Sequence, residues 1–405
     1  MESCVLLLRT CVLIGTLSTT AMAQAQEPAS INYGGFRITP TVDTELAYID
    51  NVTFVPESSE VIDSFQFVIR PEVEIYTENS FSEQRIYYRL EDARYYSSPE
   101  DNYTDQLLSY NVKLRFSDFQ GIRFGAQHLE GHDARGRGFT AGRPTVIRTT
   151  DNYSDSNVNG AYILGARRAP FYAVGSVSVR NLNYDLDTAP LFNRDRQEVS
   201  GGIVLRYRLS SVTSFALDVK RTDITYDADT RDSISLDSTR DSILIGMDWD
   251  ASAFLSGEAK IGYEERDFES ALREDFNGVD WYVDMTWRPI SNTALTLLSD
   301  FDTRENNALG DFIDTTTTRL KWMHNWLERL STSMEFGYVS QDYQGLDNEI
   351  DYRKDSTAIA NLQIDYQFRR WLHVSTFLKY SSRSSNLEII EFDRQVLGLM
   401  FKVTL

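Results

Sequence analysis

At the end of the chain every second side chain is apolar. From Leu397 to the final Leu405 every second residue is apolar, and Lys402 and Thr404 occupy intervening positions. Successive side chains of a strand point to opposite faces, so this segment predicts a strand with one apolar and one polar face.

The same alternation recurs through most of the sequence. Val279, Trp281 and Val283 alternate with Asp280 and Tyr282, and similar patterns fill 108–116, 243–250, 330–341, 358–369 and 372–381. Aromatic residues gather near the ends of the apolar lanes, and short connections alternate with long polar ones. Outer-membrane barrels have short periplasmic turns, longer outer loops and aromatic girdles. The sequence therefore predicts an all-β, transmembrane, antiparallel up-and-down β-barrel.

The pattern divides into about eighteen strands. Their expected ranges are 38–49, 62–77, 83–96, 104–117, 120–130, 158–168, 170–184, 196–209, 212–227, 239–250, 252–268, 276–289, 292–304, 313–326, 328–344, 354–369, 371–384 and 392–405. An even number places both ends of the barrel on the periplasmic side. Sixteen strands is the alternative if the hairpin near 160–185 is misassigned.

Composition narrows the class of protein. Beyond the N-terminus the chain has no run of about 18 apolar residues, which excludes a transmembrane helix in that part. A transmembrane strand, in contrast, requires only every second residue to be apolar. The net charge of −20 argues against nucleic acid as a partner. Both cysteines, Cys4 and Cys11, fall in the first 23 residues, so no thiolate metal site is expected in the mature chain.

The N-terminus has the features of a secretory signal. Arg9 precedes a short apolar stretch, and Ala21-Met22-Ala23 offers a cleavage site, with Ala23-Gln24-Ala25 as the alternative. We therefore expect a cleaved signal peptide over 1–23, a short periplasmic tail over 24–37 and a barrel over 38–405.

The polar lanes should line a water-filled lumen, because barrels of this size are not filled by their own side chains. The expected lumen residues include Lys113, Arg115, Asp284, Arg288, Asp365 and Arg369, with Asp218, Lys220, Glu258, Lys260, Arg319, Lys321, Glu335 and Lys379. Interleaved charges of both signs suit a neutral or zwitterionic hydrophilic solute. Alternatively, the charges simply pair across neighbouring strands.

The longest expected loop, 131–157, is rich in glycine and arginine. Arg135, Arg137, Arg143 and Arg148 could line a constriction if the loop folds into the lumen, where guanidinium groups hydrogen-bond hydroxyls or carboxylates. The alternative is an exposed surface loop.

Two patterns that could indicate chemistry are too sparse to predict a site. His128, Glu130 and His132 alternate along one strand, but three ligands on one strand are a weak metal motif. His373 lies near Ser375 and Ser381 without a nucleophile motif. We expect no metal, no cofactor and no enzymatic activity.

The first part of the mature chain resembles the Putative beta-barrel porin 2 family. The resemblance rests on Thr39-Pro40-Thr41-Val42, on 47–52 with its Tyr48-Ile49-Asp50-Asn51 turn, and on 63–65 and 69–73. One departure is that the spacing Gly398-x-x-Phe401 lies two residues further from the end than in many barrel signals, and the last residue is Leu. The resemblance implies an eighteen-stranded barrel associated with exopolysaccharide or capsule secretion and carries over no catalytic residues.

Together these features predict an integral protein of the Gram-negative outer membrane that exports a hydrophilic polymer. Its expected partners are outer-membrane lipids and lipopolysaccharide, the barrel-assembly machinery, a polysaccharide substrate and a periplasmic secretion partner. A general small-solute porin is the alternative, followed by a structural surface protein or a barrel hydrolase.

Overall fold

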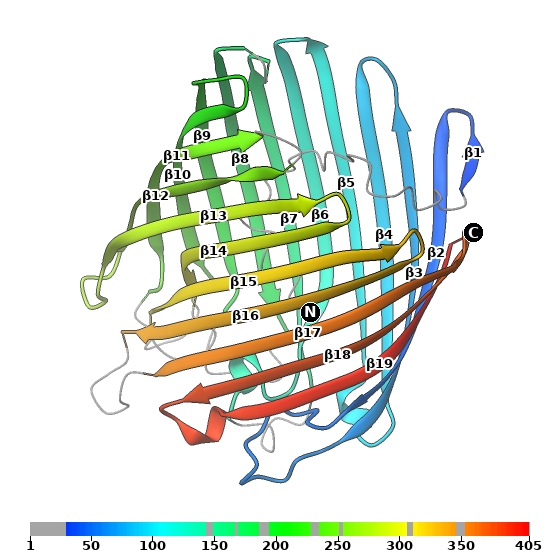
Figure 1. Ribbon diagram of the computed structural model, residues 1–405. Helices are drawn as coiled ribbons and strands as arrows, with labels where there is room; N and C mark the ends of the chain where they lie inside the picture. The colour runs from blue at the N-terminus through cyan, green and yellow to red at the C-terminus, as the bar shows by residue number, and fades with distance from the viewer. Residues whose placement is uncertain are drawn as a thin grey trace.

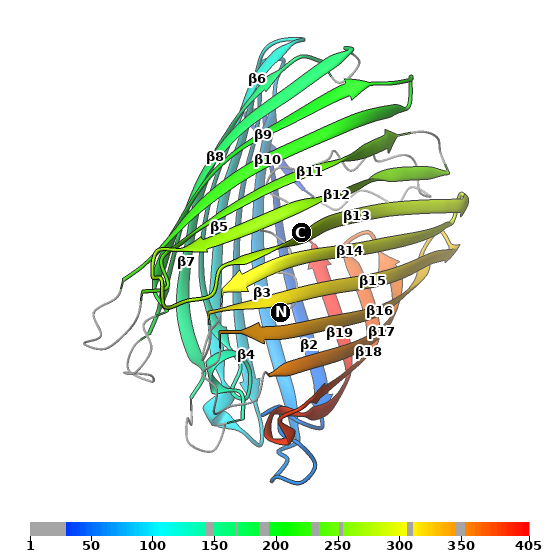
Figure 2. The same ribbon diagram turned by 90° about the vertical axis from the view of Figure 1, so that its left-hand side faces the viewer.

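A closed antiparallel β-barrel makes up the computed structural model (Figures 1 and 2), which describes residues 30–142, 149–166, 169–185, 194–227, 235–250, 254–305, 311–345 and 353–404. Strands β2 to β19 each pair with their neighbours in sequence, and β19 pairs with β2 from Val396↔Ile49 to Thr404↔Thr41. This last pairing closes the barrel with eighteen strands, as predicted.

The strands are long and similar in length. They are β1 Ile31–Tyr33, β2 Phe36–Ile49, β3 Ser64–Glu78, β4 Ser82–Tyr95, β5 Tyr103–Ser117, β6 Gln120–Asp133, β7 Asp151–Leu164, β8 Phe171–Tyr184, β9 Arg196–Arg208, β10 Thr213–Tyr226, β11 Ser238–Asp250, β12 Leu255–Phe268, β13 Phe276–Ile290, β14 Thr293–Glu305, β15 Phe312–Leu327, β16 Leu330–Gln344, β17 Lys354–Arg369, β18 Leu372–Ser385 and β19 Phe392–Thr404. Short 3₁₀ turns lie in the longer loops; those among the described residues are η1 Pro99–Asp101, η2 Gly138–Thr140 and η4 Glu388–Ile390. No helix in the described part of the chain is long and apolar enough to cross a membrane.

The predicted boundaries around the longest loop are wrong. β6 continues to Asp133 and β7 already begins at Asp151, with these two residues paired, so the connection is 134–150 rather than 131–157. The part of β7 that was not predicted, 151–157, has polar side chains on both faces, for example Asn152 and Asp155. Alternation marks a strand only where one of its faces is apolar, so a strand end with two polar faces has no signature.

Strand pairing shifts register at several of the short turns. Register shifts occur between Arg115 and Ser117, Trp287 and Ile290, Asn325 and Leu327, and Gln367 and Arg369, each beside a short turn. Bulges at the rim of a barrel bend a strand and end its pairing. They explain how tilted strands reverse through so few residues.

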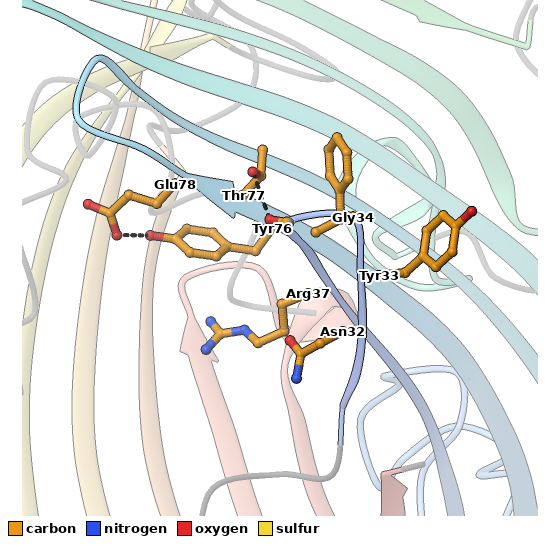
Figure 3. Close-up of a pocket in the computed structure, with 9 residues that line it drawn as sticks. Asn32, Tyr33, Gly34, Arg37, Tyr76, Thr77 and Glu78 are labelled. Carbon is orange, nitrogen blue, oxygen red and sulfur yellow. Dashed lines mark hydrogen bonds between the residues drawn. The ribbon is translucent and has the colours of Figure 1, made fainter.

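A small hairpin occupies the end of β2. Gly34 and Gly35 have φ of +57° and +85°, the backbone that a two-residue turn requires, and they allow β1 to fold back on β2. β1 pairs with β2 from Phe36 to Ile38, whereas β19 begins to pair at Thr41, so β1 continues the edge where β19 ends. A hollow of about 360 Å³ lies beside this hairpin. The Tyr76 hydroxyl donates to Glu78 at 2.7 Å, and Figure 3 shows the two side chains. Residues 24–29 of the expected tail lie outside the described residues.

Candidate functional site

The two faces of each strand meet different environments. On β12, Ile261 and Tyr263 point outward and are 58% and 46% exposed, whereas Lys260, Glu264 and Arg266 point inward and are 5%, 2% and 0% exposed. Exposed apolar side chains on the outside are what a lipid-facing surface requires. Charged side chains this deeply buried must be covered by other groups inside the barrel.

An aromatic belt surrounds the short-turn end of the outer surface. Its exposed members are Phe81, Phe116, Phe119, Phe171, Tyr207, Phe254, Trp287, Trp326, Tyr366, Phe368 and Trp371. Each lies within or close to a short turn. Aromatic residues favour the membrane–water interface, so the belt marks one boundary of the membrane-spanning region.

Several predicted lumen residues are engaged in ion pairs. On β5, Lys113 lies 3.5 Å from Glu83 and Arg115 lies 3.3 Å from Glu78. The Nζ of Lys260 on β12 lies 2.7 Å from Glu258 of the same strand and 2.6 Å from Asp218 of β10, and so links β12 to β10 across β11. Cross-strand pairing, one of the two interpretations of the charged lanes, therefore holds for these residues.

The other predicted lumen residues are spread along the wall rather than gathered. Asp365 accepts hydrogen bonds of 2.6 Å from both Gln363 and Ser375, and Arg288 donates to Ser256 at 3.3 Å. Asp284 lies directly opposite Glu258 on β12. Arg369 stacks over the neighbouring Phe368 at 5.5 Å. The structure thus does not bring the predicted set together into one site.

The arginines of the long loop have fixed partners where the structure describes them. Arg135 is buried and holds Asp101 of η1 through two bonds, Nη2–Oδ2 at 2.6 Å and Nε–Oδ1 at 3.1 Å. Arg137 lies over the Phe54 ring at 5.1 Å, and Arg394 of β19 lies over the same ring at 4.6 Å. Arg143 and Arg148 lie outside the described residues.

The described part of this loop, 134–142, runs to the seam where β19 meets β2. Gly136 has φ +87°, and a Cβ there would come within 1.7 Å of the Thr53 carbonyl oxygen in the β2–β3 loop. A Cβ on Gly142 would touch Ile389 and Ile390 in the β18–β19 loop at 3.0–3.2 Å. Glycine lets the backbone approach this closely. The loop therefore joins the outer ends of β4–β5, β2–β3 and β18–β19; a constriction lined by its arginines remains a prediction.

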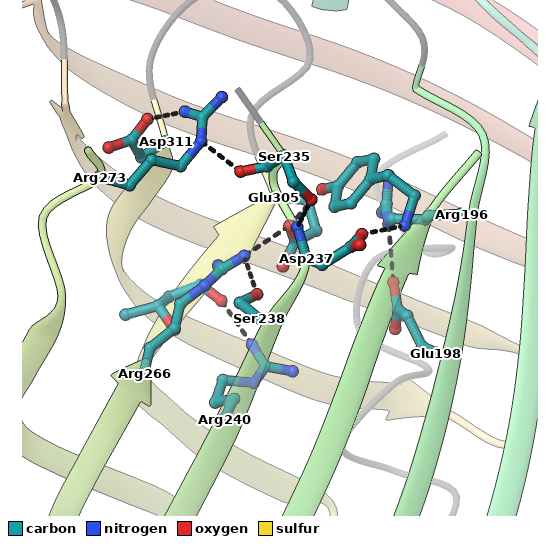
Figure 4. A network of polar contacts seen from close by, with 12 residues as sticks. Arg196, Glu198, Ser235, Asp237, Ser238, Arg240, Arg266, Arg273, Glu305 and Asp311 are labelled. Atoms are coloured by element: carbon teal, nitrogen blue, oxygen red, sulfur yellow. Dashed lines mark hydrogen bonds and ion pairs between the residues drawn. The ribbon is translucent and has the colours of Figure 1, made fainter. Parts of the chain in front are cut away.

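A second cluster of charges was not predicted from the sequence. β13 and β14 stop pairing at Tyr282↔Asp300, although β14 stays paired with β15 as far as Glu305↔Phe312. The end of β14 that no longer pairs with β13 contacts strands that are not its neighbours (Figure 4). Arg266 of β12 donates to Glu305 at 2.7 Å. Arg240 of β11 lies 3.2 Å from Asp302. We call Tyr226, Arg240, Glu264, Arg266, Asp302 and Glu305 the β14 network.

The β14 network reaches across four strands. The Tyr226 hydroxyl of β10 donates to Glu305, and the Thr303 hydroxyl of β14 donates to Glu264 of β12. Because β10 and β14 are separated by three strands, these bonds require the end of β14 to lean over the inner wall. It therefore covers part of the lumen at the long-loop end.

The adjoining loops extend this ionic cluster beyond the strands. Arg273, between β12 and β13, forms an ion pair with Asp311, just before β15. Burial raises the pKa of the Asp311 carboxyl, and the guanidinium of Arg273 opposes that rise. No pattern in the sequence pointed to the cluster, because the charges at 264–266 and 302–305 look like those of any other polar lane.

The histidines are not arranged for metal binding. His128 is exposed and its Nδ1 lies 2.8 Å from Ser156 Oγ, whereas His132 is buried and its Nδ1 lies 2.9 Å from Asp105. Within the residues that the structure describes, no three His, Cys, Asp or Glu side chains form a group that could hold a metal ion. His373 lies opposite Lys402 on β19.

The residues of the Tyr-x-Asp-Asn turn hold the seam between the first and last barrel strands. The side-chain amide of Asn51 donates to the carbonyl oxygens of Val55 and Asp393, at 2.8 and 3.0 Å. Asp50 Oδ1 accepts the backbone N–H of Gln395 at 2.7 Å. The turn thus has a structural task, which is to fasten β2 to β19 at the long-loop end.

The fold is similar to those of several bacterial proteins of known structure. A BenF-like porin from Pseudomonas fluorescens Pf-5 has a TM-score of 0.51 and 10% identity, with 91% of this chain and 99% of that chain covered. OccK9 (OpdG) from Pseudomonas aeruginosa has a TM-score of 0.48 and 10% identity over 91% and 98%. The FrpB iron transporter from Neisseria meningitidis has a TM-score of 0.47 and 11% identity over 86% of this chain, which spans 61% of the FrpB chain.

No curated protein matches the sequence. The family described as Putative beta-barrel porin 2 matches residues 24–405, which includes the entire barrel. The apolar outer lanes, the aromatic belt and the charged inner wall agree with that match. The chain therefore belongs to the Putative beta-barrel porin 2 family and is a porin-like β-barrel of the outer membrane.

Proposed function

We propose that the barrel exports a hydrophilic polymer, an exopolysaccharide or capsular polysaccharide, through the outer membrane of a Gram-negative cell. The observation that carries the proposal is the character of the inner wall. Opposite charges bond to one another there, as in Lys260 with Asp218 and Glu258. Such a wall offers hydrogen-bonding groups while much of its charge is neutralised, which suits a sugar chain better than a strongly selected ion.

The long-loop end also supports export rather than free diffusion. A barrel of this size leaves an aqueous lumen, which would leak small solutes if nothing narrowed it. The loop over 134–142 and the β14 network both lie at that end. In this proposal they limit leakage while a chain is absent. A periplasmic secretion partner would deliver the chain to the short-turn end, and lipopolysaccharide would surround the other.

A general small-solute porin is the second candidate. It is favoured by the correspondence in fold with the BenF-like porin, since 99% of that chain is covered. Nothing in the described lumen favours a structural surface protein or a barrel hydrolase over these two.

Deletion of the gene in its natural host separates the two candidates. Export predicts loss of surface polysaccharide, with recovery on complementation by the full chain but not by a chain lacking residues 401–405. A porin predicts unchanged surface polysaccharide and slower uptake of small hydrophilic solutes. Unchanged surface polysaccharide in the deletion strain would refute export.

A further inference from the structure

The last part of β14 leaves the wall of the barrel. β13 and β14 pair as far as Tyr282↔Asp300, and beyond that point β13 continues along β12 to Phe276. The remainder of β14, Phe301–Glu305, stays paired with β15 and lies against the inner wall. We call this segment the strap. It is a piece of the barrel wall that lies inside the lumen.

The register of the two strands explains why the strap separates from β13. If their ladder continued in the same register, the next pairs would be Trp281 with Phe301 and Asp280 with Asp302. The two rings already lie in contact, with centroids 5.4 Å apart. The two carboxylates, in contrast, would face each other on the inner lane, where Asp280 is already fully buried. Like charges directly opposite destabilise an antiparallel pair, so the ladder is possible in geometry but opposed by charge.

A second pair of like charges lies on the inner wall beneath the strap. Arg240 of β11 is directly opposite Arg266 of β12, and we call these two residues the arginine pair. The strap supplies carboxylates to both of them: Asp302 lies 3.2 Å from Arg240, and Glu305 lies 2.7 Å from Arg266 (Figure 4). Each guanidinium is therefore matched by a carboxylate from a strand that is not its neighbour in the wall.

Side chains, rather than a backbone ladder, hold the strap on the wall. The Thr303 backbone N–H donates to the Glu264 carboxylate at 3.4 Å, and the Phe301 ring packs against Phe276 with centroids 5.8 Å apart. Hydrogen bonds that can be exchanged for bonds to water contribute little net stability. The strap can therefore leave the wall without breaking the ladder between β14 and β15.

The groups around the arginine pair indicate which ligand could replace the strap. Guanidinium groups bind carboxylates through paired, charge-assisted hydrogen bonds. The Tyr226 hydroxyl donates to Glu305, and the Ser238 hydroxyl accepts from Arg266 at 3.0 Å, so both hydroxyls lie at the same place. Two guanidinium groups beside hydroxyls match a uronic acid, which carries a carboxylate among hydroxyls.

We propose that the strap is a displaceable gate and that the arginine pair beneath it binds the carboxylates of acidic sugar units. Binding of such a unit would release Asp302 and Glu305, and the strap would then join β13 and widen the lumen. When the sugar leaves, repulsion between Asp280 and Asp302 would return the strap to the arginine pair. That the solute is a sugar rests on the proposed function, whereas the gate does not. While no solute is bound, the strap's own carboxylates neutralise this part of the wall.

The first test joins the strap to β13. A disulfide between Val279→Cys and Thr303→Cys, which would be opposite each other if the ladder continued, would hold the gate open. The matched control is Val283→Cys with Ser299→Cys, a pair that is already opposite in the same two strands. Both cysteines of the chain fall within the expected signal peptide, so the mature protein carries only the introduced pair. The readouts are disulfide formation and single-channel conductance in planar bilayers, before and after reduction.

We expect both pairs to cross-link, and we expect only the strap pair to raise the conductance, with reversal on reduction. Heat-modifiable migration verifies folding, and neither pair removes a charge of the β14 network. Absence of the strap cross-link in folded protein that forms the control cross-link overturns the gate. So does an unchanged conductance once the strap cross-link has formed.

The second test asks whether a carboxylate opens the gate. The rate at which the strap cross-link forms is measured with a tetramer of galacturonic acid, with galacturonic acid itself and with a neutral tetramer of glucose. The measurement is repeated with Arg240→Gln added to the cysteine pair. The matched control is Arg221→Gln, because Arg221 is 62% exposed on the outer lane of β10.

We expect the acidic tetramer to accelerate the strap cross-link by roughly tenfold and the neutral tetramer to leave its rate unchanged. The acceleration should be lost with Arg240→Gln and kept with Arg221→Gln. A monomer as effective as the tetramer identifies a small acidic solute, and a tetramer that acts at far lower concentration identifies a polymer. The binding site is overturned if no acidic probe accelerates the cross-link, if the neutral tetramer does so equally, or if Arg240→Gln keeps the full effect. Surface polysaccharide in the deletion strain enters neither test, so failure here is distinguishable from failure of the export proposal.

Discussion

Arg266 illustrates how single residues neutralise charge inside the barrel. Its side chain is fully buried and lies 2.7 Å from Glu305, whose side chain is only 7% exposed. The guanidinium also stacks over Phe268 at 4.8 Å and Phe312 at 5.7 Å. A buried cation requires such compensation, because its desolvation costs several kcal/mol.

Removal of the charge on Glu305 should therefore destabilise the barrel. We expect Glu305→Gln to lower the free energy of unfolding by about 3–5 kcal/mol, since it leaves Arg266 buried without its anion. Urea titration of the folded protein in bilayers measures the loss. The control is Asp223→Asn, whose carboxylate is 60% exposed near Arg221 and should change stability by less than about 0.5 kcal/mol. Equal effects of the two changes would show that the β14 network contributes little.

Two adjacent residues of β18 test which side chains face lipid and which face the lumen. Leu378 faces outward and is 42% exposed, whereas Lys379 faces the lumen beside Phe377. We expect Leu378→Arg to cost about 2–4 kcal/mol if it lies near the bilayer midplane, and Lys379→Glu to be tolerated far better. The same urea titration compares them. Similar losses for both variants would contradict a lipid-facing and a lumen-facing lane.

At the scale of elements, the β6–β7 loop and β19 have separate tasks. The loop contacts the seam at Gly136 and Gly142, and β19 forms the seam itself. The last strand cannot be lost without leaving an open edge.

Shortening the loop should widen the channel. Deletion of 136–142 is expected to raise single-channel conductance in planar bilayers, and serine at Arg135, Arg137, Arg143 and Arg148 should shift ion preference toward cations. Deletion of 228–234, which has the same length and lies in another long connection, is the control. Unchanged conductance after the first deletion would place the restriction elsewhere, with the β14 network as the next candidate.

Loss of the end of β19 should prevent assembly. Phe401, Val403 and Thr404 pair with Thr44, Val42 and Thr41 of β2, so removal of residues 401–405 leaves part of the seam unpaired. We expect depletion from the outer-membrane fraction and loss of heat-modifiable migration on gels. Lys402→Gln, which removes inward contacts of 3.5 Å with Asp43 and 4.0 Å with Glu72 but no strand pairing, should assemble normally. Normal migration of the truncated chain would refute this role.

At the scale of the whole molecule, a net charge of −20 is compatible with membrane insertion because of where the charges lie. Charged side chains point inward, as Lys260 and Arg266 do, lie near the long-loop end, as Asp223 and Asp241 do, or lie in the short turns, as Glu328 and Arg329 do. The outward apolar lanes between that end and the aromatic belt remain available to lipid.

Insertion by this route also requires export of the chain from the cytoplasm. From the cleavage sites around Ala23 we expect the mature protein to begin near Gln24 or Gln26. Mass spectrometry of the N-terminal peptide from the outer-membrane fraction checks this expectation. Recovery of Met1 in that fraction would refute the secretory interpretation.

The sequence by itself determined the barrel and its two faces, and it favoured eighteen strands while sixteen remained the alternative. These follow from a period of two along each strand and from connections that alternate in length, both of which are local properties. Wherever lipid touches the wall, one lane must be apolar, so strands such as β17 and β19 were predicted within one or two residues.

Only the tertiary structure decided where strands end and what they contact in the regions where both faces of a strand meet water. The ends of β6 and β7, the inward lean of β14 and the opening between β5 and β6 all lie at the long-loop end, where no lipid selects one lane. Their positions depend on contacts between distant segments, such as Tyr226 with Glu305 and Gly136 with Thr53. No local sequence pattern predicts such contacts, because the same polar side chains could form hydrogen bonds with water instead.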